Sequence, residues 1–589
     1  MFVPIFFLSN EIGQLFQDIA IAISVSIFFS LIISLTLIPG ISSRILRKRD
    51  NINENSSVFR NLNKFFDSKA KKIRNNIIFI LRKILRTKKG TALSFIYILF
   101  ISILLTFFLF PKTEYLPEGN RNLIISILIP PQGYNIEKIE DIGITTEKKL
   151  QKYWEDKNSS NSGIKNFFFV ARPKSVFMGA VAENPNRIKD FINIMKKSIS
   201  GHPGFISITN QSSLFSRAVG ERRAIEIDIQ GESYDSIIYI SRILFSKLSS
   251  QYKDFQIRPK PSLSNSNPEI KILPKQINMN TVGLESSQLG LIINTIIDGS
   301  IVGEYTFEGE EIDIRLTSNK PNNISTGAIN NQFIFHKGNI FPVSHIAKVD
   351  IIDSPQQINH FERQRTIKLQ ITPDEKTNIE DAILQIKKSI YTEKLSNEAS
   401  RLGVTYKITG IAGKLREAKS SLSKNFIYAL IISYFLLSSL FQSFLYPLIV
   451  LTVVPLSSLG GILGLRLLNI FTYQPLNMLT MLGFLILLGI VVNNSILIVY
   501  QSLKYFRSGS ESIRESAIKA VKERIRPIFM TTLTTTFGLL PLALLPGSGS
   551  ELYRGLGVVI LSGLLISTFF TLILTPISFI MISRTKNQE

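Results

Sequence analysis

The sequence predicts a bundle of seven membrane-spanning helices that carries one large α+β domain outside the membrane. Three observations lead to this fold class. Hydrophobic residues make up 45% of the 589 residues, the apolar residues gather in runs of spanning length, and one long polar segment separates the runs. That polar segment alternates strand-like and helix-like patterns, which is typical of a folded domain and not of a linker.

Seven apolar runs reach, or nearly reach, the roughly 18 residues that a spanning helix needs. They are Ile19–Ile38, Ala92–Phe110, Phe426–Phe441, Pro447–Leu468, Leu476–Tyr500, Pro527–Leu545 and Gly555–Ile582. The third run is the weakest, because it is short and contains three serines. Between the second and third runs, about 310 residues contain no run of spanning length. We therefore expect two spans, one large domain, and then five spans.

The basic residues predict the orientation, because short cytoplasmic loops carry an excess of lysine and arginine. The segment from Arg44 to Lys89 holds fifteen basic residues and three acidic ones, which places it in the cytoplasm. Alternate threading puts the basic segment 507–526 and the C-terminal tail 584–589 on the same side. The short loops 469–475 and 546–553 contain no basic residue. The large domain is therefore expected outside the cytoplasm.

The charge and the composition argue against several other functions. The net charge of +23 is concentrated in the predicted cytoplasmic loops, so anionic lipid is the expected partner and nucleic acid is not. The chain has no cysteine, and its four histidines lack metal-binding spacing, so we expect no metal site and no catalytic residues. The segment Gly410 to Lys414 resembles a phosphate-binding loop, but Leu415 replaces the required serine or threonine. We expect no enzyme.

Within the polar segment, one pattern occurs twice. A strand-like stretch, Asn122–Pro130, precedes a helical stretch that opens on Asn-Ile-Glu at 135–137, and Thr366–Thr372 precedes another that opens on the same three residues at 378–380. This repetition predicts two related βαβ units. A strand and helix at 224–248 form a third pair, and the stretch 267–299 indicates a further α/β unit.

The fifth run contains adjacent amides, Asn493 and Asn494, in the sequence GIVVNNSILIV. An unpaired amide in hydrocarbon costs several kcal/mol, so each should face a partner. The two amides point about 100° apart on a helix. The sixth run contains five threonines, including Thr531. The alternative is that the amides only join helices and the threonines bond back to their own helix.

No span has an aspartate, glutamate, lysine or histidine in its central part. A proton-driven transporter needs a titratable group at that depth. The sequence therefore provides no obvious proton carrier of its own.

Long stretches resemble the resistance-nodulation-division (RND) transporters. FQSFLYPLIVLTVVPLSSLGG at 441–461 is similar to the family's junction of helices eight and nine, LNMLTMLGFLILLGIVVNNSILIVY at 476–500 to helix ten, and RIRPIFMTTLTTTFGLLPLAL at 524–544 to helix eleven. INHFERQRTIKLQIT at 358–372 is similar to a porter strand, and the first 40 residues resemble the end of helix five running into helix six. The whole chain thus resembles the C-terminal half of an RND protein of the multidrug, acriflavine-resistance type.

The resemblance implies a domain plan. Residues 1–43 are the end of helix five and helix six, 44–91 a basic cytoplasmic loop, 92–110 helix seven, 111–424 the periplasmic porter and docking domain, 425–583 helices eight to twelve, and 584–589 a cytoplasmic tail. It also implies ferredoxin-like βαβ porter subdomains, with a docking subdomain inserted in the second one.

The resemblance further implies proton-driven export of amphipathic compounds, with no cofactor except the proton motive force. The proton-binding aspartates lie on the family's fourth helix, so a separate N-terminal half is expected as partner. Asn493 matches the family's lysine position, Asn494 adjoins it, and Thr531 and Arg524 match the relay threonine and arginine. An amide cannot titrate near neutral pH, so the lysine's switch cannot be carried over literally.

The remaining implications concern location and assembly. The resemblance implies a bacterial inner membrane protein that forms trimers and works with a periplasmic adaptor and an outer-membrane channel. Phe177, in a loop at 171–180, is the best-placed residue to line a substrate cleft, whereas Phe167 to Phe169 favour strand core over an apolar ligand surface. The alternatives are a nonfunctional remnant, a membrane-anchored binding module without transport activity, and a six-helix protein-translocation auxiliary. Seven spans argue against the last.

Overall fold

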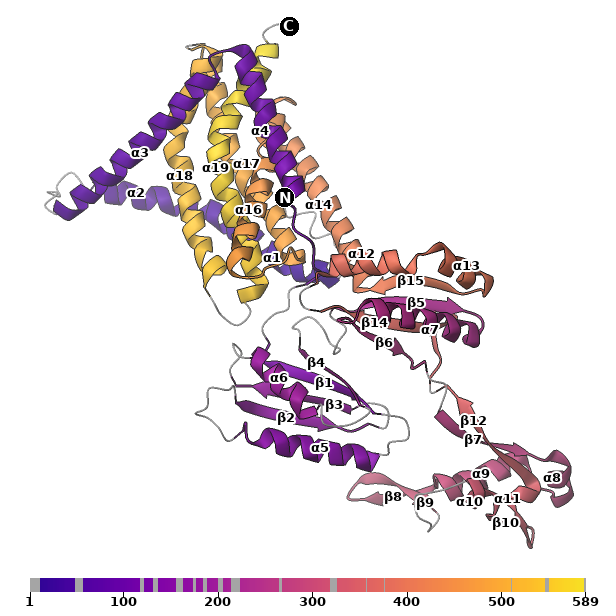
Figure 1. Ribbon diagram of the computed structural model, residues 1–589. Coiled ribbons are helices and arrows are strands. Elements are labelled where there is room, and N and C mark those ends of the chain that lie inside the picture. Colours follow the sequence, from indigo (N-terminus) through magenta and orange to yellow (C-terminus); the bar gives the residue numbers. More distant parts are fainter. Residues whose placement is uncertain are drawn as a thin grey trace.

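The structure is a computed structural model of the 589-residue chain. It describes residues 11–47, 57–116, 121–130, 136–154, 163–172, 176–183, 188–199, 205–212, 223–263, 267–317, 326–355, 357–374, 377–509, 511–545 and 550–586. Figure 1 shows a helical bundle at one end and two sheet-containing units and a further insert at the other. Residues 1–10, predicted to end a preceding helix, lie outside the described residues.

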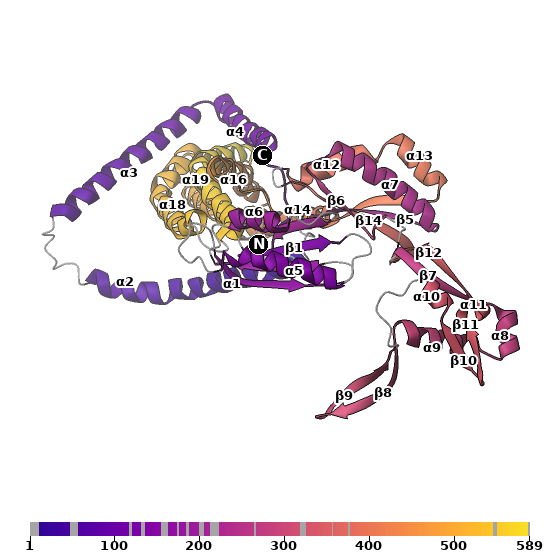
Figure 2. The same ribbon diagram turned by 60° about the horizontal axis from the view of Figure 1, so that its bottom comes forward.

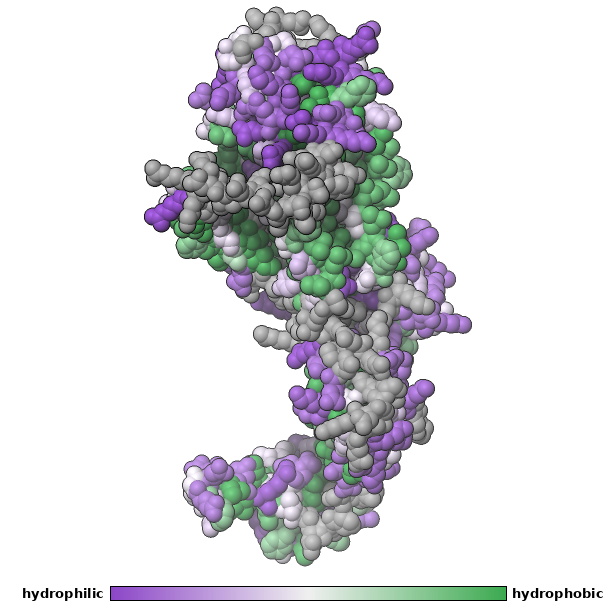
Figure 3. Space-filling model, turned by 90° about the vertical axis from the view of Figure 1, so that its left-hand side faces the viewer, coloured by the Kyte–Doolittle hydropathy of each residue, from purple (hydrophilic) through white to green (hydrophobic). Residues whose placement is uncertain are grey.

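The prediction of seven apolar helices of spanning length is confirmed within the described residues. Seven described helical segments are long and apolar enough to cross a membrane: Gln17–Arg44, Lys89–Leu109, Ile411–Phe441, Tyr446–Phe471, Met478–Arg507, Ile513–Leu544 and Leu552–Ser583. Seen from the side, hydrophobic residues form a belt between hydrophilic residues at the two ends of the bundle (Figure 3). Such a belt is expected of helices that lie in lipid.

The last helix, α19 (Ser550–Lys586), forms the centre of the bundle. It packs against α16 (Val454–Phe471), α17 (Met478–Arg507) and α18 (Ile513–Leu544). Glycines allow the closest approach: a Cβ atom added to Gly460 of α16 would lie 2.9 Å from the Cα atom of Gly563 of α19. Small residues therefore set the spacing of these helices, as is usual in membranes.

The predicted third span is part of a longer helix. Helix α14 runs without a break from Ile411 to Phe441 and starts directly after strand β15 (Thr405–Gly410). The predicted domain boundary at 424/425 therefore falls inside a helix. Its first turns are polar and lie in the α+β domain, which is why the hydropathy pattern shows only the later part. The short helix α15 (Tyr446–Leu451) follows it and leads into α16.

The N-terminal helices extend away from the bundle. Helix α1 (Glu11–Leu35) leads outward to α2 (Leu37–Arg47), and α2 and most of α3 (Ser57–Ile84) lie apart from α18 in Figure 2. Two places pack on the rest of the protein: Ala20 near the start of α1 is buried in a cluster that includes Met478 of α17, and Leu81 is buried at the end of α3. There the backbone carbonyl of Arg82 accepts a hydrogen bond of 3.0 Å from Arg514. The predicted basic loop is thus largely helical where it is described. Helix α4 (Lys88–Leu109) then packs against α16 and α19.

The first α/β unit is one antiparallel sheet with two helices. Its elements are β1 (Leu123–Ile129), α5 (Ile136–Gln151), β2 (Ile164–Val170), β3 (Val176–Ala182), α6 (Ile188–Ile199) and β4 (Ile206–Gln211). The strand order is β2-β3-β1-β4. Alternate strand residues such as Met178 pack against Phe191 of α6, which fixes the face that the helices cover.

The second α/β unit has the same strand order. Its elements are β5 (Ile225–Gly231), α7 (Tyr234–Gln251), β6 (Gln256–Lys260), β13 (Asn359–Phe361), β14 (Gln364–Thr372), α12 (Ile379–Ile390), α13 (Glu393–Arg401) and β15. The order β6-β14-β5-β15 repeats that of the first unit, and β13 extends the edge beside β14. Two related units were predicted and are present.

The repeated Asn-Ile-Glu pattern, however, does not mark equivalent positions. It precedes the first helix of the first unit and the second helix of the second unit. The true counterpart of β1 and α5 is β5 and α7, the third pair that the sequence indicated. The repetition misleads because each unit itself contains two strand-helix-strand halves, and the sequence alone does not say which halves correspond.

A third part is inserted between β6 and β13. It comprises β7 (Asn267–Pro274), α8 (Gln276–Val282), α9 (Ser286–Ile297), β8 (Ser300–Phe307), β9 (Glu310–Leu316), α10 (Thr326–Asn330), β10 (Phe333–His336), β11 (Asn339–Pro342), α11 (Val343–Ile346) and β12 (Ala347–Ser354). Strands β7 and β12 pair along their whole length and close the insert at its base. The predicted α/β unit at 267–299 is thus the beginning of this insert, from which the β8–β9 hairpin projects (Figure 2).

Candidate polar site in the membrane bundle

Helix α17 turns one of the two amides outward and the other toward the interior of the bundle. The helix begins at a buried cap, where the Asn477 side chain accepts a hydrogen bond of 2.9 Å from the Thr480 backbone N–H. Sixteen and seventeen residues further on, Asn493 is exposed, whereas Asn494 is only 5% exposed. The structure therefore separates the predicted pair into an outward amide and an inward one.

Helix α18 separates its threonines in the same way. Thr531 is exposed, and its hydroxyl donates to the Ile528 carbonyl at 2.9 Å. Thr532 is buried, and its hydroxyl lies 3.0 Å from the hydroxyl of Thr568 on α19. The alternative that the threonines bond to their own helix is thus correct for Thr531, whereas Thr532 links two helices.

The interior beside Asn494 is polar. Ser495 and Thr575 are fully buried, and their hydroxyl oxygens lie 3.5 Å apart between α17 and α19. Other buried hydroxyls of α19 donate to carbonyls about one turn earlier, as Thr571 does to Ser567 at 2.6 Å and Thr568 to Leu564 at 2.7 Å. A hydroxyl that donates to a backbone carbonyl in this way can lie inside the bundle without a large desolvation cost.

Arg524 lies at the end of the bundle opposite the α+β domain and reaches α17, but it does not contact Asn493. Its Nη2 atom donates to the Gln501 side-chain oxygen at 2.9 Å. The Gln501 nitrogen donates to Glu523 at 3.1 Å, and the Tyr505 hydroxyl donates to the same carboxylate oxygen at 2.5 Å. A hydrogen-bonded chain thus connects the C-terminal part of α17 with the N-terminal part of α18.

Gln501, Tyr505 and Glu523 were not among the residues predicted from the sequence. One signal was available for Gln501, since it lies seven residues, or two helical turns, after Asn494 and so on the same face. Both side chains are buried. A second buried amide on that face indicates a polar interior that continues toward Arg524.

The other end of α17 is tied to the α+β domain. Residues 112–115 follow α4, and Thr113 bridges Leu476 just before α17 while its backbone N–H donates to Glu380 of α12 at 2.9 Å. Next to it, the Glu114 carboxylate accepts from Arg223 at 3.1 Å and from the Ile379 N–H at 2.9 Å. The helix that carries the amides is therefore connected through one short segment to the second α/β unit.

Phe177 is not in a loop. The predicted loop 171–180 contains most of strand β3, so the prediction was wrong about the local structure. Val176 and Met178 face the helices, which puts Phe177 on the opposite face of the sheet, where its ring lies 5.5 Å from that of Phe168. The three adjacent phenylalanines alternate accordingly, because Phe167 and Phe169 pack toward the helices.

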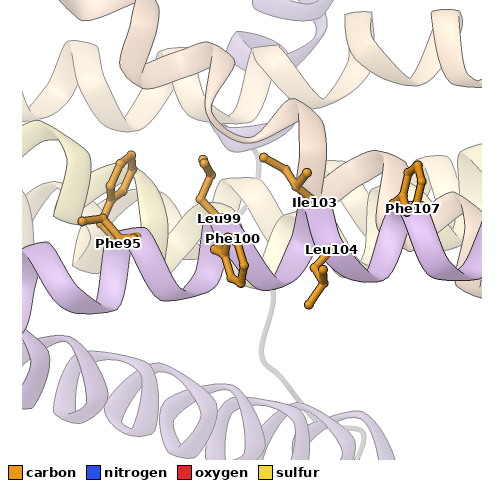
Figure 4. Close-up of a pocket in the computed structure, with 7 residues that line it drawn as sticks. Phe95, Leu99, Phe100, Ile103, Leu104 and Phe107 are labelled. Carbon is orange, nitrogen blue, oxygen red and sulfur yellow. The ribbon is translucent and has the colours of Figure 1, made fainter.

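A separate cavity of about 400 Å³ runs along α4. Figure 4 shows its lining, which consists of Phe95, Ile96, Leu99, Phe100, Ile103, Leu104 and Phe107. All of these side chains are apolar, so the cavity suits a hydrocarbon chain and offers no group for proton transfer. Within the described ranges, no group of three or more histidine, aspartate or glutamate residues could hold a metal ion.

The protein has seven helices of spanning length, two α/β units of one topology, and polar side chains at two levels of the bundle. Together these features define a multi-pass membrane protein of the transporter class. Residues 1–583 match the model of the AcrB/AcrD/AcrF family. Because the match covers nearly the whole chain, the protein belongs to this family of RND efflux transporters. The resemblance inferred from the helix motifs is thereby confirmed.

Proposed function

We propose that the protein is the C-terminal half of a proton-driven RND transporter that exports amphipathic compounds across the bacterial inner membrane. Its proton-binding aspartates belong to an N-terminal half, made as a separate chain. Asn493 and Thr531 face that half, and Asn494 and Arg524 continue the polar site into this chain. In this proposal the α+β domain lies in the periplasm, which the basic segments support, because they favour a cytoplasmic position for the opposite end of the bundle.

The exposure of Asn493 is the observation that carries this proposal. Asn493 lies in the middle of a span but on the outer surface of the described bundle. Hydrocarbon would leave its amide without hydrogen-bond partners, so a polar protein surface is the expected neighbour. An amide can donate to a carboxylate or accept from a protonated carboxyl group, so it can hold an aspartate in both states.

The burial of the spans supports a missing partner. Within the chain, 67% of the most apolar window of α17 is buried, compared with 0% for the first span and 6% for α4. The first span and α4 are long enough to cross the membrane but have little protein around them. An additional set of helices would cover part of α1 and the exposed face of α17, and lipid would cover the rest.

The domain topology supports the transport role. Both α/β units run βαββαβ with the same strand order, which is the order of ferredoxin-like units. We assign them as porter subdomains and the insert at 267–354 as the docking subdomain. Phe168 and Phe177 present paired rings on the face opposite the helices, which suits the apolar part of an amphipathic substrate. Trimers, an adaptor and an outer-membrane channel complete the proposed assembly.

The test is reconstitution of the chain with the N-terminal half in proteoliposomes under a proton gradient. Wild-type protein should export an amphipathic dye, and Asn493→Leu should abolish export while insertion and co-purification persist. Tyr500→Leu is the matched control, because Tyr500 is also exposed two turns further along α17 and should retain export. Full export by Asn493→Leu would remove that residue from the site. Co-purification without export by the wild type would favour the binding module or remnant.

A further inference from the structure

We infer that Glu523 passes the transported proton to the cytoplasm and that Gln501 is a positioning residue that holds Arg524 beside it. This inference rests on the proposed proton-driven function and assigns the release end of its pathway. It concerns the hydrogen-bonded chain at the basic end of the bundle, where α17 ends and α18 begins (Figure 1).

The geometry gives Gln501 a defined role. Its side chain is 8% exposed, and both ends of the amide are used: the oxygen accepts from Arg524 at 2.9 Å, and the nitrogen donates to Glu523 at 3.1 Å. The guanidinium can only donate and the ionised carboxylate can only accept, so the amide has one orientation that satisfies both. Gln501 therefore fixes the guanidinium and the carboxylate relative to each other across two helices.

The depth of Arg524 places this chain at the end of the proposed pathway. Arg524 precedes Thr531 by seven residues, which is two turns or roughly 10 Å along one face of α18. Arg524 itself keeps its proton at all relevant pH values. A group that exchanges protons must therefore be found next to it, and Glu523 is the carboxylate that the Gln501 amide connects to it.

The surroundings of Glu523 suit proton release. Glu523 is exposed, so its carboxylate meets bulk water, while the Tyr505 hydroxyl holds one oxygen at 2.5 Å. Lys519 lies one turn earlier on α18, over the Tyr505 ring at 4.6 Å, and is itself paired with Glu511 at 2.7 Å. Between Gly555 and Ser583, α19 has no titratable side chain.

Helix α3 also packs against α18. It offers α18 the Arg82 carbonyl, which Arg514 uses. In the described part of the chain, the Tyr505 hydroxyl and the Gln501 amide contact the carboxylate, Lys519 lies close to it, and Arg524 is linked to it through Gln501.

The proposed step is a simple relay. A water molecule beside Arg524 accepts a proton from the pathway and passes one of its protons to a Glu523 carboxylate oxygen, so that one O–H bond forms at Glu523 and the water is left neutral. The carboxyl group then releases its proton to a cytoplasmic water and becomes a carboxylate again. The positive charge of the Arg524 guanidinium disfavours an excess proton on the neighbouring water. The Gln501 amide lies between the guanidinium and Glu523 and prevents a direct ion pair.

The test measures proton release by the reconstituted two-half transporter at the cytoplasmic side. Glu523→Gln should slow substrate-coupled proton release by about a hundredfold, the lower end of the range for loss of a positioned acid–base group, while the substrate KM stays unchanged. Added small buffers such as acetate should restore the rate, because they can carry protons from the pathway to water. Glu523→Asp should stay close to wild type. Gln501→Leu should also slow release, although buffer should rescue it less.

Glu511→Gln is the matched control, since Glu511 is an acid at the same end that pairs with Lys519 and does not touch Gln501. It should release protons at the wild-type rate. A wild type that exports without coupled protons, or does not export, would refute the proposed function. A coupled wild type with an unaffected Glu523→Gln would refute only this inference. A slowed Glu523→Gln that no buffer restores would show a merely structural role and would also refute it.

Discussion

The Glu114 carboxylate lies 3.1 Å from the Arg223 guanidinium, and the two side chains are only 8% and 12% exposed. This ion pair lies where the segment after α4 meets the second α/β unit, and Arg223 also donates to the carbonyls of Asp374 and Thr377. The pair therefore connects the second α/β unit to the segment that follows α4 at the edge of the membrane bundle.

Removing one partner of this buried pair should be costly. Glu114→Leu leaves the Arg223 charge buried without its carboxylate and the Ile379 N–H without its acceptor. We expect a loss of roughly 3 kcal/mol in the free energy of unfolding, measured on purified protein in detergent. Lys348→Ala is the control: its pair with Asp350 is 66% and 31% exposed, and the loss should stay below about 1 kcal/mol. Equal losses of stability in the two variants would contradict the conclusion that the buried Glu114–Arg223 pair is more costly to break than an exposed pair.

The same junction should make stability depend on pH. Burial alone would raise the pKa of Glu380. Hydrogen bonds from Thr113, together with the hydrogen bond and the positive charge of Lys419, lower the pKa by more than burial raises it, so that it lies below the ordinary value. A carboxyl group with a depressed pKa stabilises the fold above its unfolded pKa, about 4.3 for glutamate, and loses this contribution as the pH falls through the folded pKa.

The measurement is the unfolding temperature of wild type and Glu380→Gln between neutral pH and about pH 3. The difference between the two proteins should be largest near neutral pH and shrink in acid. Glu362→Gln, which breaks an exposed pair with Lys407, should show no such dependence. A difference that is constant with pH would rule out the carboxylate as the cause.

The membrane part was predicted from the sequence more fully than the α+β domain. Runs of apolar residues identify spans directly, and all seven were found, since lipid demands apolar side chains along the whole length. The start of α14 was missed because its first turns, with Lys414 and Arg416, lie outside the apolar run. The position of Phe177 was missed because strand β3 is rich in small residues, Gly179 among them, which weakens its strand pattern.

The polar site was predicted only in part for a related reason. Helical geometry already puts Asn493 and Asn494 about 100° apart, but it does not say which amide faces inward. That choice depends on how α18 and α19 pack against α17, which is tertiary information. The contact between Arg524 and Gln501 joins positions 23 residues apart on two helices, and no single-helix pattern contains it.

The crossing of α16 and α19 should not tolerate a larger residue. A Cβ atom at Gly460 would lie 2.9 Å from the Gly563 Cα and 2.9 Å from the Ile566 Cβ, so Gly460→Ala must push the two helices apart. We expect a loss of about 1–3 kcal/mol in stability and reduced yield of folded protein in the membrane. Gly538→Ala is the control, because nothing lies within 4 Å of its added Cβ atom.

Gly179 should control the paired rings of the first α/β unit. A Cβ atom there would lie 2.5 Å from the Phe168 ring and 2.8 Å from the Ile124 carbonyl oxygen, so Gly179→Ala must displace the ring that pairs with Phe177. If this face binds the apolar part of the substrate, Gly179→Ala and Phe177→Ala should each weaken dye binding, measured by fluorescence titration, by about tenfold.

The two variants should not add, because both alter one pair of rings. Gly413→Ala, at a helix position with nothing within 4 Å, should leave dye binding unchanged. Unchanged binding in Phe177→Ala would place the substrate elsewhere. Weakened binding in Gly179→Ala alone would mean that the backbone beside Ile124, and not the aromatic pair, shapes the binding face.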